Sequence, residues 1–401
     1  MKILLFVAKI VGRTGGTEKV MCNMANELTL RGHQVTVVCD ESKQGVPFYP
    51  LMKEVKLINL DGSGRAKQYR IKKIIRELTK PLRRTFLYPF FPNPVERQEI
   101  QEFAPRFRNV VHNVKPDIVI SPLLTYHVRI VKTIGHDRPL ILMHHFDSVD
   151  FLKKPFDEFV SLRHCDCLQL LFQSFEKEVQ KAFPYQKTCV IPNVVAPIDE
   201  VDLANPGESR DEHVITMVGR LDKRQKQQHF LIRSFSYLAK EYPQWKVLFY
   251  GDTFTRDYEE YLKTLIRKLK LENQMFLMGT TNKLPDVLRK SDIFAFPTAY
   301  EGFPLALTEA MAVGLPCAGL KTASAVNELI VDGYNGFLSD NNEQDFAQKS
   351  KRLMDDPQLR VTLGRNGHEF VKQFEPKKIW DQWENLITET VKQFSQKDTN
   401  Q

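Results

Sequence analysis

A cluster of basic residues between Arg220 and Lys226 could stabilise a phosphate-bearing leaving group. Four cations lie within these seven residues, and the segment follows an apolar run, residues 214–218, that predicts a strand. A diphosphate that leaves a sugar gathers negative charge, which guanidinium and ammonium groups stabilise. A charge run is also typical of a solvent-exposed loop. The functional interpretation depends on position, because open parallel α/β sheets bind ligands at the carboxyl ends of their strands.

Two carboxylates, Glu301 and Glu309, flank a predicted junction between a loop and a helix. Pro304 suits the first helical position, so the amides of Leu305 and Ala306 could bind a phosphate. Glu301 precedes the helix and could reach a sugar hydroxyl, whereas Glu309 lies further along it and could reach a ribose. A pair of glutamates alone is usually two solvated side chains. The functional interpretation of the two glutamates therefore depends on their position at the loop–helix junction.

A glycine-rich segment follows the first predicted strand, residues 2–10. Gly12, Gly15 and Gly16 let the backbone turn tightly, and the amides of the next helix could bind an anion. The spacing does not match the dinucleotide-binding fingerprint, and the segment lacks the Lys-Ser/Thr ending of a P-loop. A purely structural turn is an equally good interpretation.

Short apolar runs alternate with helical patterns along the chain, which predicts a parallel α/β architecture. Residues 17–30 predict a helix with Thr17 as a candidate cap. The other predicted helices are 229–241, 258–269 and 376–394. The other predicted strands are 34–39, 117–121, 140–143, 189–191, 214–218, 246–250, 275–278, 293–296 and 316–320.

The length of 401 residues favours two domains. Residues 196–212 are rich in Pro, Asp, Glu and Gly and predict a linker between them. We therefore expect two doubly wound, Rossmann-like domains, residues 1–195 and 213–375, that face each other across a central cleft. Residues 376–401 contain the last helix.

Charge and cysteine content limit the partners. The net charge of +8 permits a polyanionic partner. Since no nucleic-acid-binding motif is present, a phosphorylated substrate or an anionic membrane is favoured and nucleic acid is not expected. Six scattered cysteines without zinc-site spacing indicate buried thiols and no metal site. No apolar run approaches the roughly 18 residues of a membrane span, and residues 1–7 lack a cleavage site, so we expect a cytoplasmic protein.

Several motifs together resemble the retaining glycosyltransferases of family four, which have the GT-B fold. They are the Glu301–Glu309 spacing with Ala-Met-Ala-Val-Gly-Leu-Pro at 310–316, Gly-Arg-Leu at 219–221 with Lys226, Glu328 with Asp-Gly-Tyr-Asn-Gly-Phe-Leu at 332–338, Gly-Gly-Thr-Glu at 15–18, and residues 25–38. They occur in the family's order from residue 2 to about residue 340. The resemblance implies an acceptor-binding N-terminal domain, a C-terminal domain that binds a nucleotide sugar, and a last helix that crosses back to the first domain.

The resemblance also implies residue roles. Arg220 and Lys226 should act on the donor diphosphate, Glu301 should hold the donor sugar, and Glu309 should bind the ribose. The other residues expected to bind the donor are Gly15, Gly16, Gly219, Phe303, Pro304, Leu305 and Ala306.

The sequence departs from the family pattern at two positions. Lys226 stands one residue later than the family's lysine, so Lys223 or Arg224 could replace it. Pro304 stands where the family often has a second glycine, which could reshape the sugar pocket.

In this family a histidine at the end of a strand in the first domain often lies near the transferred sugar. His144 and His145 end the predicted strand 140–143. We favour His145 as the catalytic histidine because it is the last residue before the loop. A structural imidazole is the alternative for both, and His127 and His164 are weaker candidates.

Residues 65–91 suit an anionic membrane surface. Nine Lys/Arg and one acid, Glu77, lie within 65–84, and an aromatic stretch follows at 86–91. A basic amphipathic helix beside aromatics is typical of peripheral membrane binding. A solvated surface helix is the alternative.

The combined expectation is a hexosyltransferase that moves a hexose, with retention, from a nucleotide sugar to a glycan or lipid-linked acceptor. UDP-linked hexoses are the common donors in this family, so the resemblance implies a UDP-linked donor. It also implies a role in bacterial surface polysaccharide or lipopolysaccharide synthesis. No metal or other cofactor is expected, because Arg220 and Lys226 would replace the metal and no Asp-x-Asp motif is present. The alternatives are a sugar-nucleotide epimerase or phosphorylase on the same architecture, and an inactive module that acts as a membrane-associated adaptor.

Overall fold

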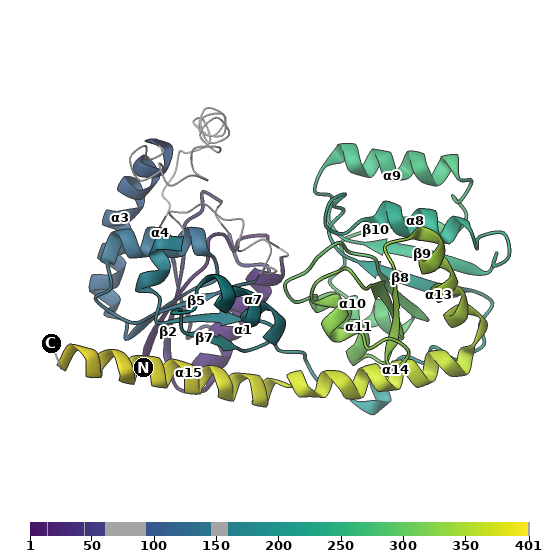
Figure 1. The fold of residues 1–401 in the computed structure, drawn as a ribbon. Helices are drawn as coiled ribbons and strands as arrows, with labels where there is room; N and C mark the ends of the chain where they lie inside the picture. Colours follow the sequence, from purple (N-terminus) through teal and green to yellow (C-terminus); the bar gives the residue numbers. More distant parts are fainter. Residues whose placement is uncertain (14, 44, 61–93, 146–158, 400–401) are drawn as a thin grey trace. The chain divides into compact units, whose positions relative to one another are not determined.

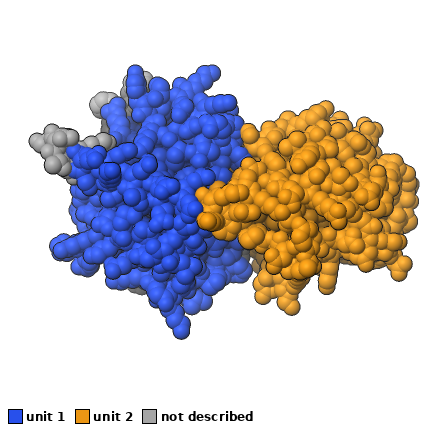
Figure 2. All heavy atoms as spheres, turned by 90° about the horizontal axis from the view of Figure 1, so that it is seen from below, with its two compact units in different colours: residues 1–192, 380–401 blue, residues 193–379 orange. Residues whose placement is uncertain are grey.

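A computed structural model describes residues 1–13, 15–43, 45–60, 94–145 and 159–399. The chain forms two compact units, which Figure 2 shows in different colours. Unit 1 contains residues 1–192 and 380–401, and unit 2 contains residues 193–379. Residues 196–212 therefore group with unit 2, where the Ala204 amide donates to the Val313 carbonyl at 2.8 Å.

The centre of unit 1 is a seven-stranded parallel sheet with the order β3-β2-β1-β4-β5-β6-β7 (Figure 1). The strands are β1 Lys2–Phe6, β2 Gln34–Cys39, β3 Lys56–Asn59, β4 Ile118–Ser121, β5 Leu140–Met143, β6 Cys167–Leu170 and β7 Thr188–Val190. Because β1 lies between β2 and β4, the strand order reverses at β1. Ligands commonly bind beside the carboxyl ends of strands at such a point.

Helices cover this sheet and bury its central strands on both faces. They are α1 Gly16–Leu30, α3 Pro94–Val114, α4 Leu124–Ile134 and α7 Gln173–Ala182, with a 3-10 turn at Ser161–His164. Phe6 packs edge-on against Phe103 and Phe107 of α3, with centroids 5.6 and 6.0 Å apart. Ile3 and Leu5, which alternate with Leu4 and Phe6 along β1, are also 0% exposed. A strand buried on both faces reads as a continuous apolar run, as β1 does.

The two ends of α1 are fixed in different ways. The helix begins at Gly16 with Gly15 as its N-cap, so the expectation that Thr17 caps it is wrong: the helix starts one residue before Thr17. At the other end, Arg31 forms ion pairs with Asp381 and Glu384, each at 2.7 Å. The last helix, α15 Pro376–Thr399, is thereby held against α1 within unit 1.

The centre of unit 2 is a six-stranded parallel sheet with the order β10-β9-β8-β11-β12-β13. The strands are β8 His213–Val218, β9 Trp245–Tyr250, β10 Met275–Gly279, β11 Ile293–Phe296, β12 Cys317–Leu320 and β13 Gly336–Ser339. The helices are α8 Gln228–Ser236, α9 Arg256–Lys268, α10 Leu284–Arg289, α11 Leu305–Ala312, α12 Val326–Leu329, α13 Glu343–Asp355 and α14 Pro357–Val371. The order reverses at β8, which lies between β9 and β11 and is followed by the cationic segment.

No helix in the described ranges combines the length and the apolar character that a membrane span needs. None of the six cysteines forms a disulfide. Five of them are buried and Cys189 is half-buried, which agrees with the expected buried thiols.

Candidate active site

The loop after β8 carries the predicted phosphate ligands and is ordered by Asp222. The Asp222 carboxylate accepts hydrogen bonds from the amides of Arg224 and Gln225 at 2.9 and 3.1 Å, and from the Arg220 guanidinium at 2.9 Å. Burial opposes ionisation of this carboxyl, but these donors outweigh burial and lower the pKa of Asp222. Gln228, fully buried, donates to the carbonyls of Gly219 and Arg220 from the start of α8. The loop is thus held in one conformation by its own side chains.

Lys226 and Glu301 form an ion pair at the carboxyl edge of the sheet. The Lys226 Nζ lies 2.6 Å from Glu301 Oε1, and the two side chains are only 15% and 8% exposed. The same carboxylate oxygen accepts from the Thr298 hydroxyl at 2.7 Å. The ammonium also lies over the Phe296 ring, 4.7 Å from its centroid. These contacts fix the directions of both charged groups before any substrate binds.

Three loops meet around this pair. The Gln225 carbonyl accepts from the Ala299 amide and the Thr298 hydroxyl, both at 2.8 Å. The Glu301 amide donates to the Ser324 carbonyl at 3.2 Å. The residues come from the loops after β8, β11 and β12, three adjacent strands. Lys226 and Glu301, both expected to act on the donor, therefore lie together at this edge of the sheet.

Arg220 points to a different neighbour from Lys226. Its guanidinium lies over the Phe254 ring, 4.3 Å from the centroid, and its side chain is 47% exposed. The loop after β9 reaches Arg220 because Gly251 has no side chain: a Cβ there would lie 2.1 Å from the Gly219 carbonyl oxygen. Lys223 lies over the Tyr261 ring of α9, 5.3 Å from its centroid. Lys226, rather than Lys223, is therefore the lysine beside Glu301.

Helix α11 begins one residue later than expected, with Pro304 as N-cap and Leu305 as its first residue. The Pro304 carbonyl accepts from the amides of Leu307 and Thr308 at 3.0 and 3.1 Å. The first two amides, of Leu305 and Ala306, have no intrahelical acceptor and are available to an anion. Glu309 lies in the second turn and is half-buried.

Phe303, expected at the donor, is 7% exposed and packs edge-on against Phe374. Its ring supports the start of α11 from within unit 2.

In unit 1, the histidine expected near the sugar follows β5. The Nε2 of His145 is buried and has no hydrogen-bond partner among the described residues. Burial lowers the pKa of His145 to about 3, with the neighbouring His144 adding to the effect. A buried polar atom without a partner is costly, so a neutral imidazole with an unused nitrogen is suited to a ligand hydroxyl. His144, in contrast, is 4% exposed and donates its backbone amide to Gln169.

The weaker histidine candidates are engaged elsewhere. His127 is 1% exposed and its Nε2 lies 3.3 Å from the Ser161 carbonyl oxygen. His164 contacts His136 edge-on, with the ring centroids 5.7 Å apart.

Gly15 and Gly16 form the junction between β1 and α1. A Cβ at Gly15 would lie 2.3 Å from Glu18 Oε2, so the absence of a side chain leaves room for that carboxylate. Burial raises the pKa of Glu18, against the opposing influence of its amide hydrogen bond and of Arg13. The basic segment 65–91 lies outside the described residues.

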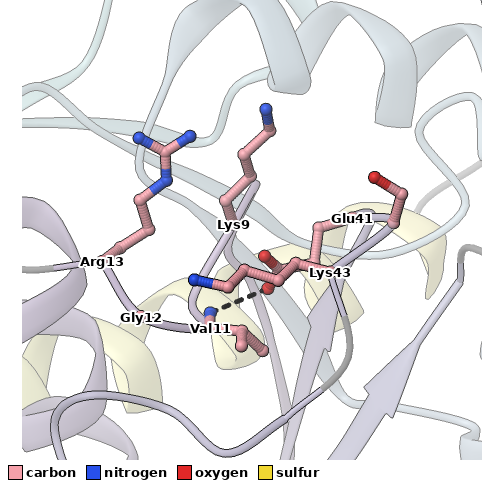
Figure 3. A pocket seen from close by; sticks show the side chains of 7 residues that line it. Lys9, Val11, Gly12, Arg13, Glu41 and Lys43 are labelled. Carbon is pink, nitrogen blue, oxygen red and sulfur yellow. Dashed lines mark hydrogen bonds between the residues drawn. The ribbon is translucent and has the colours of Figure 1, made fainter. Parts of the chain in front are cut away.

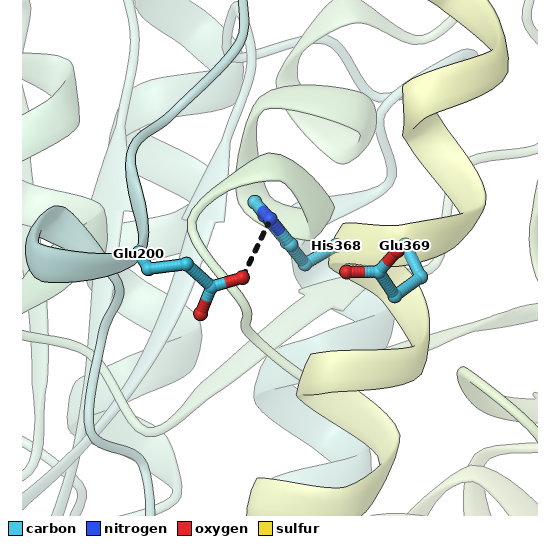
Figure 4. A group of neighbouring side chains, drawn as sticks. All are labelled: Glu200, His368 and Glu369. Atoms are coloured by element: carbon cyan, nitrogen blue, oxygen red, sulfur yellow. Dashed lines mark ion pairs between the residues drawn. The ribbon is translucent and has the colours of Figure 1, made fainter.

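One group of side chains has metal-ligating atoms close together among the described residues: Glu200, His368 and Glu369 (Figure 4). The His368 Nδ1 already bonds the Ala312 carbonyl at 2.7 Å, and Glu369 pairs with Lys372. Both carboxylates lie on the exposed surface. These residues come from the 3-10 turn Glu200–Asp202 and from α14, not from the loops around Glu301.

Sequence reasoning missed Asp222, Thr298 and Gln228, the residues that orient the charged groups. Asp222 could have been recognised as a turn-forming aspartate directly before a charged loop. Nothing in the sequence pairs Thr298 with Glu301, because their contact depends on the path of the loop after β11.

Comparison with known proteins agrees with the fold. A family model described as Glycosyltransferase Family 4 matches residues 14–197, and one described as Glycosyl transferases group 1 matches residues 199–370. Among solved structures, Alr3699/HepE of Anabaena, crystallised with UDP and glucose, has a TM-score of 0.71 at 20% identity, covering 97% of this chain and 100% of its own.

The names of two curated relatives describe transferases that act on lipid-linked glycans. The GalNAc-alpha-(1->4)-GalNAc-alpha-(1->3)-diNAcBac-PP-undecaprenol alpha-1,4-N-acetyl-D-galactosaminyltransferase of Campylobacter jejuni is 25% identical over 97% of this chain and 99% of its own. The UDP-Gal:alpha-D-GlcNAc-diphosphoundecaprenol alpha-1,3-galactosyltransferase of Escherichia coli is 31% identical over 51% of this chain and 55% of its own.

The two parallel-sheet, Rossmann-like units have the GT-B fold. The two family models together span most of the chain, and the protein belongs to the family 4-like glycosyltransferases. Its enzyme class is that of a hexosyltransferase.

Proposed function

We propose that the protein transfers a hexose from a UDP-sugar to a lipid-linked glycan, with retention of configuration and without a metal ion, in bacterial surface glycan synthesis. The main observation behind the proposal is the ion pair between Lys226 and Glu301, which forms without substrate beside the loop of Arg220 in unit 2. The names of the relatives support the donor and the acceptor class, since they contain UDP-galactose and undecaprenyl diphosphate.

In this proposal the protein stabilises charge rather than forming a covalent intermediate. Negative charge grows on the donor diphosphate as the sugar–phosphate bond breaks. Lys226 and Arg220 bind the diphosphate oxygens, and the amides of Leu305 and Ala306 add two donors. The acceptor hydroxyl attacks from the same face and passes its proton to a diphosphate oxygen. Arg220 and Lys226 thereby take the place that a divalent ion has in metal-dependent transferases.

Glu301 has two roles in this account. Its carboxylate fixes the Lys226 ammonium, and its remaining oxygen binds a hydroxyl of the donor sugar. Thr298 holds the carboxylate in place through the 2.7 Å hydrogen bond. Glu309 binds the ribose, and His145 donates or accepts a hydrogen bond at the transferred sugar through its unused ring nitrogen. Gly15 and Gly16 bind the donor phosphates through their backbone amides, since the Glu18 carboxylate lies where a Cβ of Gly15 would be.

A panel of nucleotide sugars tests the donor half of the proposal. Thermal unfolding is measured with each nucleotide sugar in excess EDTA, for the wild type and for the variants Arg220→Ala and Glu309→Ala. A ligand at a hundred times its Kd stabilises the fold by about 2.7 kcal/mol, which is readily seen as a rise in Tm.

The expected result is a Tm rise with one UDP-sugar that EDTA does not remove and that both variants lose. Arg224→Ala is the matched control, because the Arg224 side chain is exposed and only its backbone amide contributes to the loop. If no nucleotide sugar stabilises the wild type, the transferase proposal is wrong and an adaptor role takes its place. A Tm rise that needs Mg²⁺ would contradict metal independence alone.

A further inference from the structure

An exposed aromatic ring lies against Arg220 at the proposed diphosphate site. The central guanidinium carbon of Arg220 is 4.3 Å from the centroid of the Phe254 ring, and Phe254 is 60% exposed. The ring comes from the loop between β9 and α9. Because most of Phe254 faces solvent, burial in the core of unit 2 does not explain its place beside a cation.

The loop that carries Phe254 is fixed to the loop that carries Arg220. The Leu221 amide donates to the Asp252 carbonyl at 2.8 Å, and Leu221 forms a parallel bridge with Thr253. The Thr253 hydroxyl in turn donates to the Glu259 carboxylate of α9 at 2.7 Å. These contacts fix the backbone directly before Phe254, so the ring is held beside Arg220 before any substrate binds.

Phe254 and Asp222 together fix the direction of Arg220. The guanidinium lies over the Phe254 ring, and its Nη2 donates to the Asp222 carboxylate at 2.9 Å. Among the described residues, this guanidinium forms no other hydrogen bond. Since a guanidinium has five N–H donors, the two contacts leave donors for the oxygens of a diphosphate.

The two cations of the proposed donor site share this arrangement. Each lies over an aromatic ring and pairs with a carboxylate: Arg220 with Phe254 and Asp222, and Lys226 with Phe296 and Glu301. Lys223 of the same loop lies over the Tyr261 ring but has no carboxylate partner in the part of the chain that the structure describes. Ring and carboxylate thus occur together at the two cations that the proposed reaction places on the diphosphate.

Cations at the corresponding edge of the other sheet have no ring beneath them. Lys9, Arg13 and Lys43 line a hollow of about 380 Å³ that follows β1 and β2 in unit 1 (Figure 3). Within the described ranges, none of these three cations lies over an aromatic ring. A supporting ring is therefore not a general property of cations at strand ends in this molecule.

We infer that Phe254 is a positioning residue for transfer: its ring holds the Arg220 guanidinium in the direction in which it binds the donor diphosphate. The inference rests on the proposed function, in which Arg220 stabilises the leaving diphosphate. A cation oriented in advance stabilises growing negative charge without first having to reorganise. The contact between cation and ring also strengthens when water is excluded from it, as by a bound diphosphate.

A double-mutant cycle tests whether Phe254 acts through Arg220. The four full-length proteins are the wild type, Phe254→Leu, Arg220→Ala and the double variant. Calorimetry measures the Kd of UDP. Steady-state kinetics in EDTA measure kcat and KM for the UDP-sugar that raises the Tm in the donor panel, with a farnesyl-diphosphate-linked N-acetylhexosamine as acceptor.

Two further variants complete the design. Phe254→Tyr keeps the ring and should behave like the wild type. Tyr261→Leu is the matched control, because it removes the ring under Lys223, a cation of the same loop. Thermal unfolding of every variant without ligand shows whether the fold is retained, which is expected for Phe254→Leu because the side chain is exposed.

Phe254→Leu should lower kcat about three- to tenfold, the range expected for loss of a cation–ring contact. Free UDP carries the charge of the leaving group and should bind about threefold more weakly. The KM for the UDP-sugar should change less than about twofold, since its diphosphate carries less charge before the bond breaks. In the Arg220→Ala background the same substitution should have no further effect, because the ring has no cation to orient.

Three results would overturn the inference. An equal loss from Phe254→Leu in the Arg220→Ala background would show that Phe254 contacts the donor itself. An unchanged kcat and UDP Kd in Phe254→Leu would show that Asp222 alone orients the guanidinium. An equal loss in Tyr261→Leu would show that any ring beside this loop has the same effect.

The wild type separates failure of this inference from failure of the proposed function. If the wild type neither binds UDP nor transfers a sugar, the proposed function is wrong and the inference falls with it. If the wild type is active and Phe254→Leu is equally active, only the role of Phe254 is wrong.

Discussion

Among single residues, the proposed mechanism depends on which charged groups are oriented before the substrate binds. Lys226 is held by Glu301 and by the Phe296 ring, and Glu301 is held by Thr298. A cation fixed in direction stabilises developing charge without first having to reorganise. Lys223, three residues earlier, contacts Tyr261 of α9 instead.

Replacing Lys226 with alanine should reduce kcat/KM by about 10²- to 10³-fold, the size typical of losing one preorganised donor. Lys223→Ala removes the same charge from the same loop and should change kcat/KM less than about threefold. Steady-state kinetics with saturating acceptor measure both variants. Equal losses in the two variants would mean that the net charge of the loop matters and that the position of Lys226 does not.

Buried histidines predict a loss of stability in mild acid. Burial lowers the pKa of His127 to about 4, against an ordinary value near 6.5. Between these values the unfolded chain binds a proton that the folded chain does not, so stability falls as the pH drops below 6.5. One such group costs about 1.4 kcal/mol at pH 5.5 relative to neutral pH.

Urea unfolding of His127→Gln at pH 7.5 and pH 5.5 measures this contribution. The variant should lose about 1 kcal/mol less than the wild type over that interval, because glutamine does not titrate. His112→Gln is the control, since His112 lies on the exposed side of α3. If the wild type and His127→Gln lose the same amount of stability, His127 is not the group that is held neutral.

At the scale of elements, the position of α11 depends on a close approach between glycines. Gly364 of α14 lies so near the turn after α11 that a Cβ there would be 1.9 Å from the Gly314 carbonyl oxygen. Gly367, one turn later, would place a Cβ at 3.5 Å from Met311, an ordinary contact. The helix that carries Glu309 is thereby packed against α14 through backbone contact.

Gly364→Ala should destabilise unit 2 by about 1–3 kcal/mol, because backbone atoms must move apart. It should also weaken the Tm response to the donor, since α11 moves with the turn. Gly367→Ala should be neutral or slightly stabilising, as expected for Ala over Gly in a helix. Thermal unfolding of both variants, with and without the donor, measures the change in stability and in the Tm response. A stable Gly364→Ala variant would show that the two helices are not in close contact.

Ten of the thirteen described strands could be predicted from the sequence because they are apolar runs, whereas β3, β6 and β13 were missed. Helices α3, α4 and α7 of unit 1 were not predicted. Strand β1 was predicted by its continuous apolar run, and β8 and β11 by theirs. Strand β3 was missed because it is short and none of its residues is fully buried, so it has no strong apolar signal. Strand β13 was missed because it begins at Gly336, inside what reads as a turn.

The candidate site could be predicted less completely. The motifs indicated Arg220, Lys226, Glu301 and the start of α11, because those residues follow predicted strands. The contacts that orient them come from residues up to 76 positions apart, such as Gln225 and Glu301, and no local pattern encodes them.

At the scale of the whole molecule, the last helix is shared by the two units. Helix α15 begins in unit 2, and its residues from 380 onward belong to unit 1. Trp380 and Trp383 are 5% and 3% exposed, and Ile387 is fully buried. Arg31 adds two ion pairs to this helix from the end of α1. The C-terminal helix is therefore part of the core of unit 1.

Trp383→Ala should destabilise unit 1 by about 3–5 kcal/mol, the cost of removing a large buried aromatic ring. At temperatures below the unfolding transition of unit 1, the Trp383→Ala variant should bind the donor through unit 2 as the wild type does. Calorimetric unfolding with and without UDP measures both effects. Lys392→Ala is the control, since Lys392 lies on the exposed side of the same helix. An unchanged unfolding profile in Trp383→Ala would show that the helix is not required by unit 1.

The proposed reaction is metal-independent, retaining transfer to a lipid-linked acceptor. The most direct test incubates the protein in EDTA with a UDP-sugar and a farnesyl-diphosphate-linked N-acetylhexosamine, and determines the new linkage by proton NMR. We expect a single product whose anomeric configuration equals that of the donor, and no product with Glu301→Gln or Lys226→Ala. A product of inverted configuration, a requirement for a divalent ion, or donor binding without any transfer would contradict it.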